Sequence, residues 1–340
     1  MINDYILYTV CAVITLLFYL NLSKISPIFN IYDFPDKKRK FHNKKTPIIG
    51  GILNLLPIVI LTIYYNEYYF FIFLVLYTSI GIFDDKLSIS PNSRLVYLSF
   101  SIFLFCILDS NIILTEITFS SFNKTIKFYL LSIPITILCI LLLTNALNMI
   151  DGINGLCSSY KISSLLLIFF YLIVSEKSGM ILENNLQILQ FLKNLIIIFV
   201  TVLLIFLVFN INGKVFLGDS GVYLSSGIFS YILINIYKIS PILTPEIIFL
   251  ILFLPGIDML RVFILRIYNK KHPFIGDRNH LHHILLNKLN NKQIILLYII
   301  IQIISLLSFH VFKNFFLILL ICLSIYLILF LKYKNYYDNK

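Results

Sequence analysis

Hydrophobic residues dominate this chain in long, nearly uninterrupted runs that short polar segments separate. A helix needs about 20 apolar residues to cross the roughly 30 Å hydrocarbon core of a bilayer, and most runs approach that length. Such runs must be helical, because lipid offers no partner for backbone N–H and C=O groups. The pattern predicts an all-α polytopic membrane protein of about eleven transmembrane helices. The expected helices are residues 5–22, 46–64, 68–83, 95–110, 128–147, 156–174, 195–211, 222–238, 246–265, 293–311 and 315–332.

Composition supports this fold class. Of the 340 residues, 59% are hydrophobic and 13% are charged, and the mean hydropathy is +0.92. These values exclude an ordinary soluble globular protein. No linker or repeat interrupts the pattern, so we expect one transmembrane domain, residues 1–340. The five cysteines have no metal-ligand spacing and are interpreted as buried small hydrophobic residues.

Basic residues indicate how the helices are oriented. The first apolar run follows Asp4 and precedes a Lys-rich and Arg-rich stretch, which is the reverse of a secretory signal. With an odd number of crossings, most Lys and Arg residues share the side of that stretch, which the positive-inside rule makes cytoplasmic. The N-terminus is then outside and the C-terminus cytoplasmic. Topology and anionic lipid account for the net charge of +11, so we expect no nucleic-acid partner.

The loops on the two predicted faces differ in content. Outside, the segment 111–127 alternates around a polar turn, which predicts a short β-hairpin. Inside, Asp84 and Asp85 follow the third apolar run. Asp151 follows the fifth run, and Asp219 precedes the eighth. The topology therefore brings four carboxylates to one face, although any one of them alone could be a solvated helix end or a helix cap.

These carboxylates predict a site for a divalent cation. Asn145, Asn148 and Asp151 are spaced i, i+3 and i+6, along one side of a continuing helix. The adjacent Asp84 and Asp85 repel each other, so keeping both ionised requires a cation or another source of positive potential. Hard oxygen ligands suit Mg²⁺, which binds proteins through one or two carboxylates plus waters and substrate phosphates.

Positive side chains lie in the same loops and indicate phosphate chemistry. Carboxylate-bound Mg²⁺ surrounded by Lys and Arg is typical of phosphoryl transfer, where catalysis is mostly positioning and charge neutralisation. The chain has no P-loop motif, so a substrate that carries its own diphosphate fits better than ATP. The basic residues are Lys44, Lys45, Arg94, Lys214 and Arg278.

Taken together, the polar motifs resemble those of the polyprenyl-phosphate N-acetylhexosamine-1-phosphate transferases. The chain is more similar to the WecA-like branch of this glycosyltransferase 4 superfamily than to the MraY translocases. The resemblance implies transfer of a sugar 1-phosphate, most simply GlcNAc-1-phosphate, from a UDP-sugar to undecaprenyl phosphate, with release of UMP. It also implies Mg²⁺ or Mn²⁺ as cofactor, a bacterial inner membrane location and a role in cell-envelope glycan synthesis, and it is compatible with a homodimer. The motifs, within residues 39–283, are RKFHNKKTPIIGG, DD followed by SPNSRL, NALNMIDGINGL, KVFLGDSG and DRNHLHH.

By this resemblance, Asp219 is the principal metal ligand, with Asn148 near the same ion. Asp84 and Asp85 are expected to orient or deprotonate the lipid phosphate, and Asp151 is a further catalytic residue. Phe216 is expected to stack on uracil unless it is plain core packing, and Asn210 to hydrogen-bond the base. The substrate-binding residues that the resemblance implies are His42, Lys45, Arg94, Asn145, Asn154, Asn210, Phe216, Arg278, His280, His282 and His283.

A departure from the family pattern falls on a predicted site residue, Asn154. Asn154 stands where many relatives carry a second Asp, and its amide oxygen can accept the same hydrogen bond.

The histidine loop, residues 278–283, has two interpretations. His280 and His283 with Asp277 could bind zinc, although three ligands from one turn strain a tetrahedral site. We expect instead that Arg278 and the three imidazoles cover the diphosphate and sugar of the donor. The H-x-H-H spacing favours a UDP-GlcNAc-like donor over a muramyl-peptide.

Other functions stay open at this stage. An MraY-type phospho-MurNAc-pentapeptide translocase would share most motifs. A transporter would place ionisable residues near mid-span, whereas the deepest charged candidates of this chain, Asp258 and Arg261, form an i, i+3 pair near the inner end of a helix. An inactive homologue is the third alternative. Whether the lipid phosphate attacks directly or through a covalent intermediate is also open.

Overall fold

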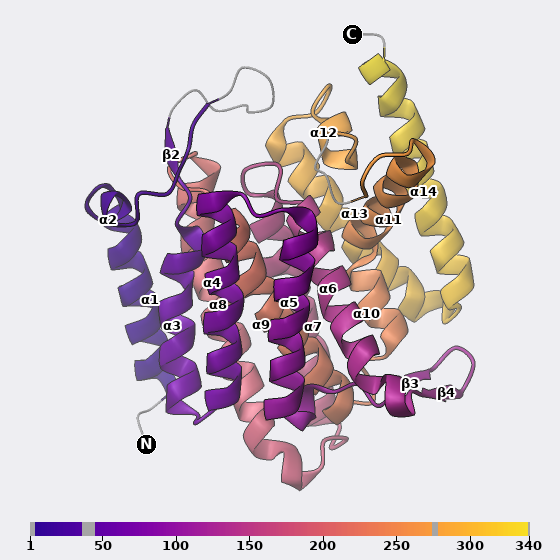
Figure 1. Cartoon of the computed structure of the whole chain (residues 1–340). Coiled ribbons are helices and arrows are strands. Elements are labelled where there is room, and N and C mark those ends of the chain that lie inside the picture. Colours follow the sequence, from indigo (N-terminus) through magenta and orange to yellow (C-terminus); the bar gives the residue numbers. More distant parts are fainter. Residues whose placement is uncertain (1–3, 36–44, 274–277, 339–340) are drawn as a thin grey trace.

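The computed structural model describes residues 4–35, 45–273 and 278–338, which form a bundle of long helices (Figure 1). The helices are α1 (Asp4–Leu20), α2 (Leu22–Phe29), α3 (Gly50–Tyr64), α4 (Tyr68–Leu87), α5 (Pro91–Leu108), α6 (Ser132–Met149), α7 (Leu156–Lys177), α8 (Leu186–Ile211), α9 (Gly218–Ile239), α10 (Pro245–Ile251), α11 (Phe253–Tyr268), α12 (Leu281–Leu285), α13 (Asn291–Phe312) and α14 (Phe315–Asp338). Two antiparallel strand pairs, β1 (Tyr32–Asp33) with β2 (Thr46–Pro47) and β3 (Glu116–Phe119) with β4 (Lys124–Lys127), complete it.

The prediction of an all-α polytopic membrane protein is confirmed. Each predicted apolar segment coincides with a helix or a helix pair. Seven of the described helices are long and apolar enough to cross a membrane, or up to nine if each bent pair counts as one span. The predicted number of about eleven crossings is larger than the nine that helix length and composition support among the described residues. One reason is that α3, with 15 residues, is shorter than a full span.

The predicted helix 246–265 is broken instead of continuous. Its two parts, α10 and α11, meet at an angle of 75°. Pro255 has no N–H to donate to the carbonyl of Ile251, four residues earlier. That carbonyl accepts hydrogen bonds from Tyr160 Oη at 2.6 Å and Gln302 Nε2 at 2.9 Å instead. Neighbouring helices therefore satisfy the polar group that the break releases.

Helix α9 forms the centre of the bundle, with every residue from Ser220 to Ile236 buried. Helices α3 and α4 approach its first turn at backbone distance. A Cβ on Gly81 would lie 2.3 Å from Ser220 Cα, and one on Gly51 would lie 2.2 Å from Gly221 N. Only glycine permits these approaches, which hold the start of α9 between α3 and α4.

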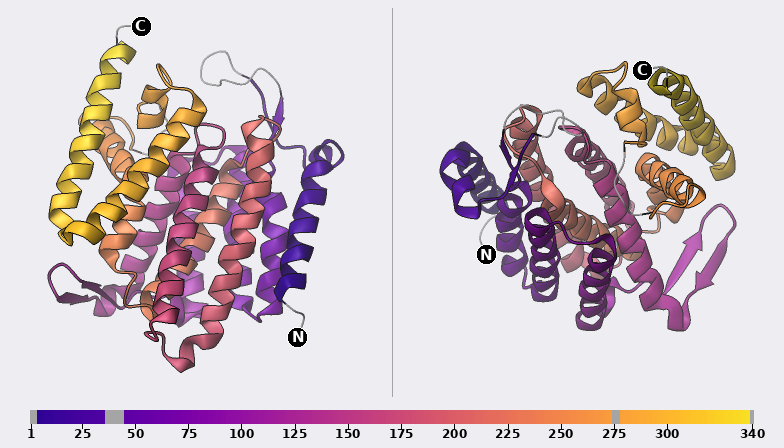
Figure 2. Two further views of the ribbon diagram at one scale, coloured as in Figure 1. Left: turned by 180° about the vertical axis from the view of Figure 1, so that it is seen from behind. Right: turned by 45° about the horizontal axis from the view of Figure 1, so that its top comes forward.

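The predicted β-hairpin in 111–127 is confirmed as β3 and β4, with Glu116 opposite Lys127. It lies at the end of the bundle opposite α12 (Figures 1 and 2). The hairpin is tied to the helices by two backbone amides: Thr118 N donates to Tyr237 Oη, and Ser121 N donates to the Glu246 carboxylate, each at 2.8 Å.

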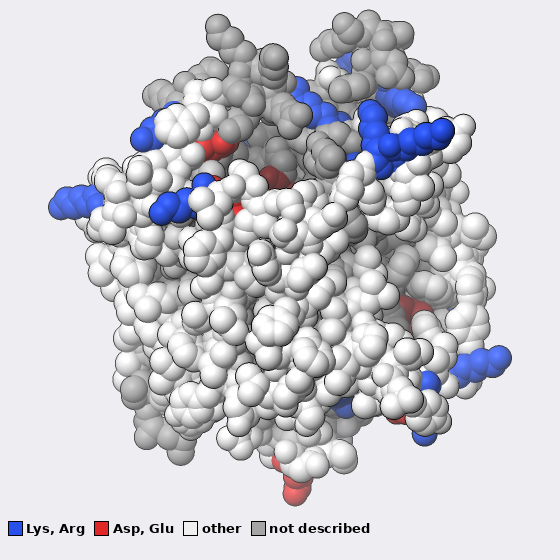
Figure 3. Space-filling model, in the orientation of Figure 1, with Lys and Arg blue, Asp and Glu red and all other residues white. Residues whose placement is uncertain are grey.

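Charge is concentrated at the two ends of the bundle. Figure 3 shows Lys and Arg side chains gathered around the end that carries α12, above a broad and nearly uncharged belt. We call this end, where α4 ends and α9 begins, the site end. Helix α1 starts at the opposite end and α14 finishes at the site end (Figure 1), as an odd number of crossings requires.

Candidate active site

The first turn of α9 is held by Asp85 at the end of α4. Asp85 Oδ1 accepts a hydrogen bond from Asp219 N at 2.7 Å, and Oδ2 accepts from Ser220 N at 3.0 Å. The first N–H groups of a helix have no partner within the helix, and the helix dipole favours a negative charge there. Both oxygens of Asp85 thus fix the backbone that carries Asp219.

The neighbouring Asp84 is buried and fully engaged. Its carboxylate forms an ion pair with Arg94, with Nε 2.6 Å from Oδ2, and accepts from Tyr223 Oη at 2.9 Å and Ile89 N at 3.0 Å. Tyr223, four residues after Asp219 on α9, was not anticipated, although this i, i+4 spacing places the two on one helix face. These contacts favour a positioning role for Asp84.

Asp219 and Asn148, the predicted metal pair, are in contact. Asn148 Nδ2 at the end of α6 donates to Asp219 Oδ1 at 3.1 Å. Among the described residues no group of three or more His, Cys, Asp and Glu side chains is arranged to hold a metal. Mg²⁺ does not need such a group, because one or two carboxylates, an amide oxygen and waters suffice. The donor set therefore fits Mg²⁺ better than zinc.

Asp151 lies beside this pair, in the turn between α6 and α7. Burial raises the pKa of its carboxyl to about 7; the ammonium of Lys161 opposes this shift, and the negative charge of Asp219 adds to it. Lys161 is itself fully buried on α7 and donates to Ser225 Oγ at 2.5 Å. The sequence signal for this residue is a lone Lys within an apolar helix.

Asn210 forms contacts that the sequence did not predict. Both ends of its amide are engaged inside the protein: Oδ1 accepts from Gly155 N at 2.7 Å, and Nδ2 donates to Val215 O at 2.9 Å. Asn210 therefore joins the α6–α7 turn to the α8–α9 loop, and its contact with a base stays a prediction. Asn154 also reaches this loop, since a Cβ on Gly213 would lie 3.7 Å from its Nδ2.

The predicted substrate-binding residues Phe216 and Lys45 lie near β2. Phe216 is half-buried, and its backbone is pinned by hydrogen bonds to Pro47 O and from Gly50 N. Lys45 Nζ lies 3.7 Å from the centre of the Tyr32 ring, a cation–π contact.

Asn145 Nδ2 donates to Leu141 O of its own helix at 2.9 Å. His42 lies outside the described residues. None of these placements tests substrate binding, which stays a prediction.

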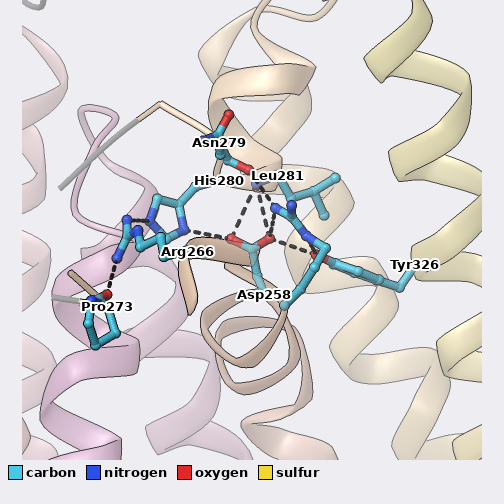
Figure 4. A network of polar contacts seen from close by, with 8 residues as sticks. Asp258, Arg266, Pro273, Asn279, His280, Leu281 and Tyr326 are labelled. Carbon is cyan, nitrogen blue, oxygen red and sulfur yellow. Dashed lines mark hydrogen bonds and ion pairs between the residues drawn. The ribbon is translucent and has the colours of Figure 1, made fainter. Parts of the chain in front are cut away.

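Within the histidine loop, His280 is placed differently from the prediction. It is buried, its Nδ1 lies 3.0 Å from Asp258 Oδ2, and Arg266 lies on its other ring nitrogen at 3.4 Å (Figure 4). Both nitrogens are therefore engaged inside the protein and anchor the loop, and a contact between His280 and a substrate stays a prediction. Arg278 is partly exposed.

His282 and His283 pack against the α6–α7 turn. A Cβ on Gly152 would lie 2.5 Å from His282 Nε2 and 3.0 Å from His283 Nε2. His282 is fully buried, and neither ring nitrogen has a hydrogen-bond partner among the residues that the structure describes. Burial, and then the neighbouring His283, lowers the pKa of His282, so the ring is neutral.

An apolar groove of about 580 Å³ runs between α4 and α5. Ile89 and Ser93 line the groove at the site end, and Leu104 lines it deeper in the bundle. Ile89 N is bonded to Asp84, and Ser93 precedes Arg94 in the chain. The groove therefore opens beside the Asp84–Arg94 ion pair.

Comparison with known proteins gives a consistent result. The chain is 28% identical over 258 residues to a probable undecaprenyl-phosphate N-acetylglucosaminyl 1-phosphate transferase of Bacillus subtilis (strain 168), covering 72% of this chain and 67% of that protein. It is 24% identical over 268 residues to an undecaprenyl-phosphate alpha-N-acetylglucosaminyl 1-phosphate transferase of Thermotoga maritima, covering 78% and 76%. It is 26% identical over 207 residues to a phospho-N-acetylmuramoyl-pentapeptide-transferase of Acetivibrio thermocellus, covering 55% and 58%.

The region that carries the aspartates also matches a family as a whole. Residues 68–237, half of the chain, match the family described as Glycosyl transferase family 4. This region contains Asp84, Asp85, Asp151 and Asp219, and it extends from the start of α4 to the last turn of α9. The histidine loop lies beyond it. The chain therefore belongs to glycosyl transferase family 4.

Proposed function

We propose that the protein transfers N-acetylglucosamine 1-phosphate from its UDP-sugar to undecaprenyl phosphate and releases UMP. The observation that carries this proposal is the Asp219–Asn148 pair at the first turn of α9, held by Asp85 and faced by Asp151. Two of the three relatives above are named for such a transferase. Carboxylates gathered at a helix N-terminus suit a reaction on phosphate groups, which cations and backbone N–H groups stabilise.

In this mechanism the protein mainly positions charged groups. Asp219 and Asn148 would hold Mg²⁺, which when bound neutralises charge on the donor diphosphate. Asp85 keeps the Asp219 side chain oriented, because it fixes the first turn of α9. Asp84 holds the guanidinium of Arg94, whose side chain is 25% exposed and so remains open to an acceptor phosphate. Direct attack by that phosphate requires no protein nucleophile, and we favour it.

The groove between α4 and α5 supports a lipid acceptor. Its lining is almost entirely apolar, and it includes Ile80, Phe83, Tyr97, Phe100 and Leu104. A polyprenyl chain in this groove would place its phosphate beside Arg94. Bulk added inside the groove, as in Ser101→Phe, should raise the KM for undecaprenyl phosphate but leave the KM for the donor unchanged.

We also propose the finer topology: about eleven crossings, with the N-terminus outside and the site end on the cytoplasmic face of a bacterial inner membrane. The positive side chains at the site end support this orientation (Figure 3). Single cysteines introduced at Lys86 and Lys124, in a variant without the native cysteines, test it. Only the second should react with an impermeant thiol reagent applied to intact cells.

A second candidate is transfer of phospho-MurNAc-pentapeptide, since one relative is named for that reaction. The two functions differ in the donor. Purified protein should therefore be incubated with undecaprenyl phosphate, Mg²⁺ and a panel of UDP-sugars that includes UDP-GlcNAc and UDP-MurNAc-pentapeptide. We expect UMP and a lipid-linked sugar from UDP-GlcNAc. Product from the pentapeptide donor alone would favour the second candidate, and no product from any donor would contradict both.

A further inference from the structure

A second buried polar network lies in α11, α12 and α14, away from the carboxylates of the site. Its centre is Asp258, which is 1% exposed. The Asp258 carboxylate accepts from Tyr326 Oη at 2.7 Å, from Arg261 Nη2 at 2.8 Å and from Leu281 N at 3.1 Å. It also pairs with His280 Nδ1 at 3.0 Å (Figure 4). Partners from three helices thus meet at one carboxylate.

The two arginines of this network bind the backbone of the loop that leads to α12. Arg261 Nη2 donates to Asn279 O at 2.5 Å, and its Nε donates to Tyr326 Oη at 2.5 Å. Arg266 Nη1 donates to Pro273 O at 2.7 Å (Figure 4). The described parts of the loop are therefore held on both sides of residues 274–277.

Tyr326 connects the C-terminal helix to this network. The α14 span is only 17% buried, yet Tyr326 is 2% exposed. Among the α14 side chains that the structure describes, Tyr326 alone hydrogen-bonds to another element; the Ser324 hydroxyl, for example, donates to Leu320 O of its own helix. Packing of α14 against its neighbours does not require a hydroxyl group at this position. The Tyr326 hydroxyl instead has a specific partner, a buried ion pair.

The network also reaches the proposed donor site. The His280 ring is stacked parallel to His282, with centroids 5.7 Å apart and an angle of 9°. His282 Nε2 in turn lies against Gly152, next to Asp151. A shift of His280 would therefore move the ring that packs on the α6–α7 turn.

We propose that Tyr326 and Asp258 are positioning residues that hold the histidine loop against the α6–α7 turn and thereby set the affinity for the UDP-sugar. This inference rests on the proposed function for the identity of the ligand. It assigns to α14, which contributes nothing to the carboxylate cluster, a part in donor binding. Affinity for the lipid acceptor is unaffected, because the groove between α4 and α5 has no residue in this network.

The first test needs no catalysis. Leu281 N donates to Asp258, so hydrogen exchange at this amide reports on the network. Tyr326→Phe should speed exchange at Leu281 about tenfold, the effect of losing one hydrogen bond to a buried charged group. Ser324→Ala removes a hydroxyl from the same helix and should leave it unchanged. Unchanged exchange in Tyr326→Phe would overturn the proposal.

The second test measures binding. Calorimetry with UDP-GlcNAc and Mg²⁺ should show about tenfold weaker binding for Tyr326→Phe and Asp258→Asn, and unchanged binding for Ser324→Ala. In the transfer assay the donor KM should rise while kcat and the acceptor KM stay within about twofold. A merely structural role would move kcat and both KM values together and would overturn the proposal. If the wild-type protein binds UDP-GlcNAc but transfers nothing, the proposed function fails. The positioning role is still decided in that case by hydrogen exchange at Leu281 and by calorimetry with UDP-GlcNAc.

Discussion

The protein contains two buried carboxylate centres that are built in opposite ways. Asp258 is surrounded by donors, including Arg261, His280 and a tyrosine hydroxyl, so its negative charge is compensated within the protein. The negative charge of Asp219 adds to the raised pKa of Asp151, which Lys161 offsets only in part, and the only side chain hydrogen-bonded to Asp219 among the described residues is the amide of Asn148. Removing a partner from a compensated buried charge destabilises the fold, whereas a partly compensated charge keeps a potential that a cation or a substrate can relieve.

The largest effect is expected at Asp219. Asp219→Ala should lower kcat by about a thousandfold or more, because the proposed metal ligand is lost. Chelation by EDTA should reduce wild-type transfer to a similar level, and added Mg²⁺ should restore it only in the wild type. Release of UMP measures both effects. Wild-type turnover by the variant would remove Asp219 from the site.

Removal of the cap on α9 should have the next largest effect. Asp85→Ala leaves Asp219 N and Ser220 N without their acceptor, so we expect kcat to fall about a hundredfold and stability to fall by about 1–2 kcal/mol. Ser90→Ala is a matched control, since Ser90 caps α5 through Ser93 N. It should cost similar stability without loss of kcat. Equal rate losses in the two variants would mean that capping is only structural.

A smaller effect is expected at Gly152. Gly152→Ala places a methyl group 2.5 Å from His282 Nε2, so the His282 and His283 rings must move away from the turn. Donor affinity should fall about tenfold, measured by calorimetry with UDP-GlcNAc. Gly256→Ala, where an added Cβ meets nothing within 4 Å, should bind as the wild type does.

The smallest effect concerns stability and pH. A carboxyl whose pKa is raised on folding to about 7 binds more protons in the folded state, so its cost to stability grows as pH rises from about 4 to 7 and then stays constant. In EDTA, Asp151→Asn should therefore raise the Tm by a few degrees at pH 8 and by much less at pH 5. Asp258→Asn should lower the Tm at both pH values, because its carboxylate is compensated. A Tm gain for Asp258→Asn would erase the contrast between the two centres.

The sequence predicted what depends on composition along the chain, and it missed what depends on partners across helices. Hydropathy located the long helices, and their order brought Asp85, Asn148 and Asp219 to one end. The break before α11 releases the carbonyl of Ile251, which accepts hydrogen bonds from Tyr160 and Gln302. These partners lie on other helices, so no local sequence pattern shows them.

The same limit explains why the contacts of two site residues were not predicted. Asn210 and His280 have the residue types that bind substrates, and their motifs resemble those of the family. Tertiary contacts with Gly155 and Asp258 nevertheless occupy their polar atoms. The i, i+4 relation of Tyr223 to Asp219 was readable in the sequence, but the contact with Asp84 depends on how α4 packs on α9.

The burial of α9 has a consequence for how the protein is assembled in the membrane. Its mean hydropathy of 1.3 is the lowest of the seven apolar helices, and 83% of the segment is buried, whereas α14 has a hydropathy of 2.8 and is 17% buried. A weakly apolar segment gains little from lipid on its own, and its serines and glycines suit contact with other helices instead. The helix that carries Asp219 should therefore integrate into the bilayer efficiently only after α3 and α4 are in place to receive it.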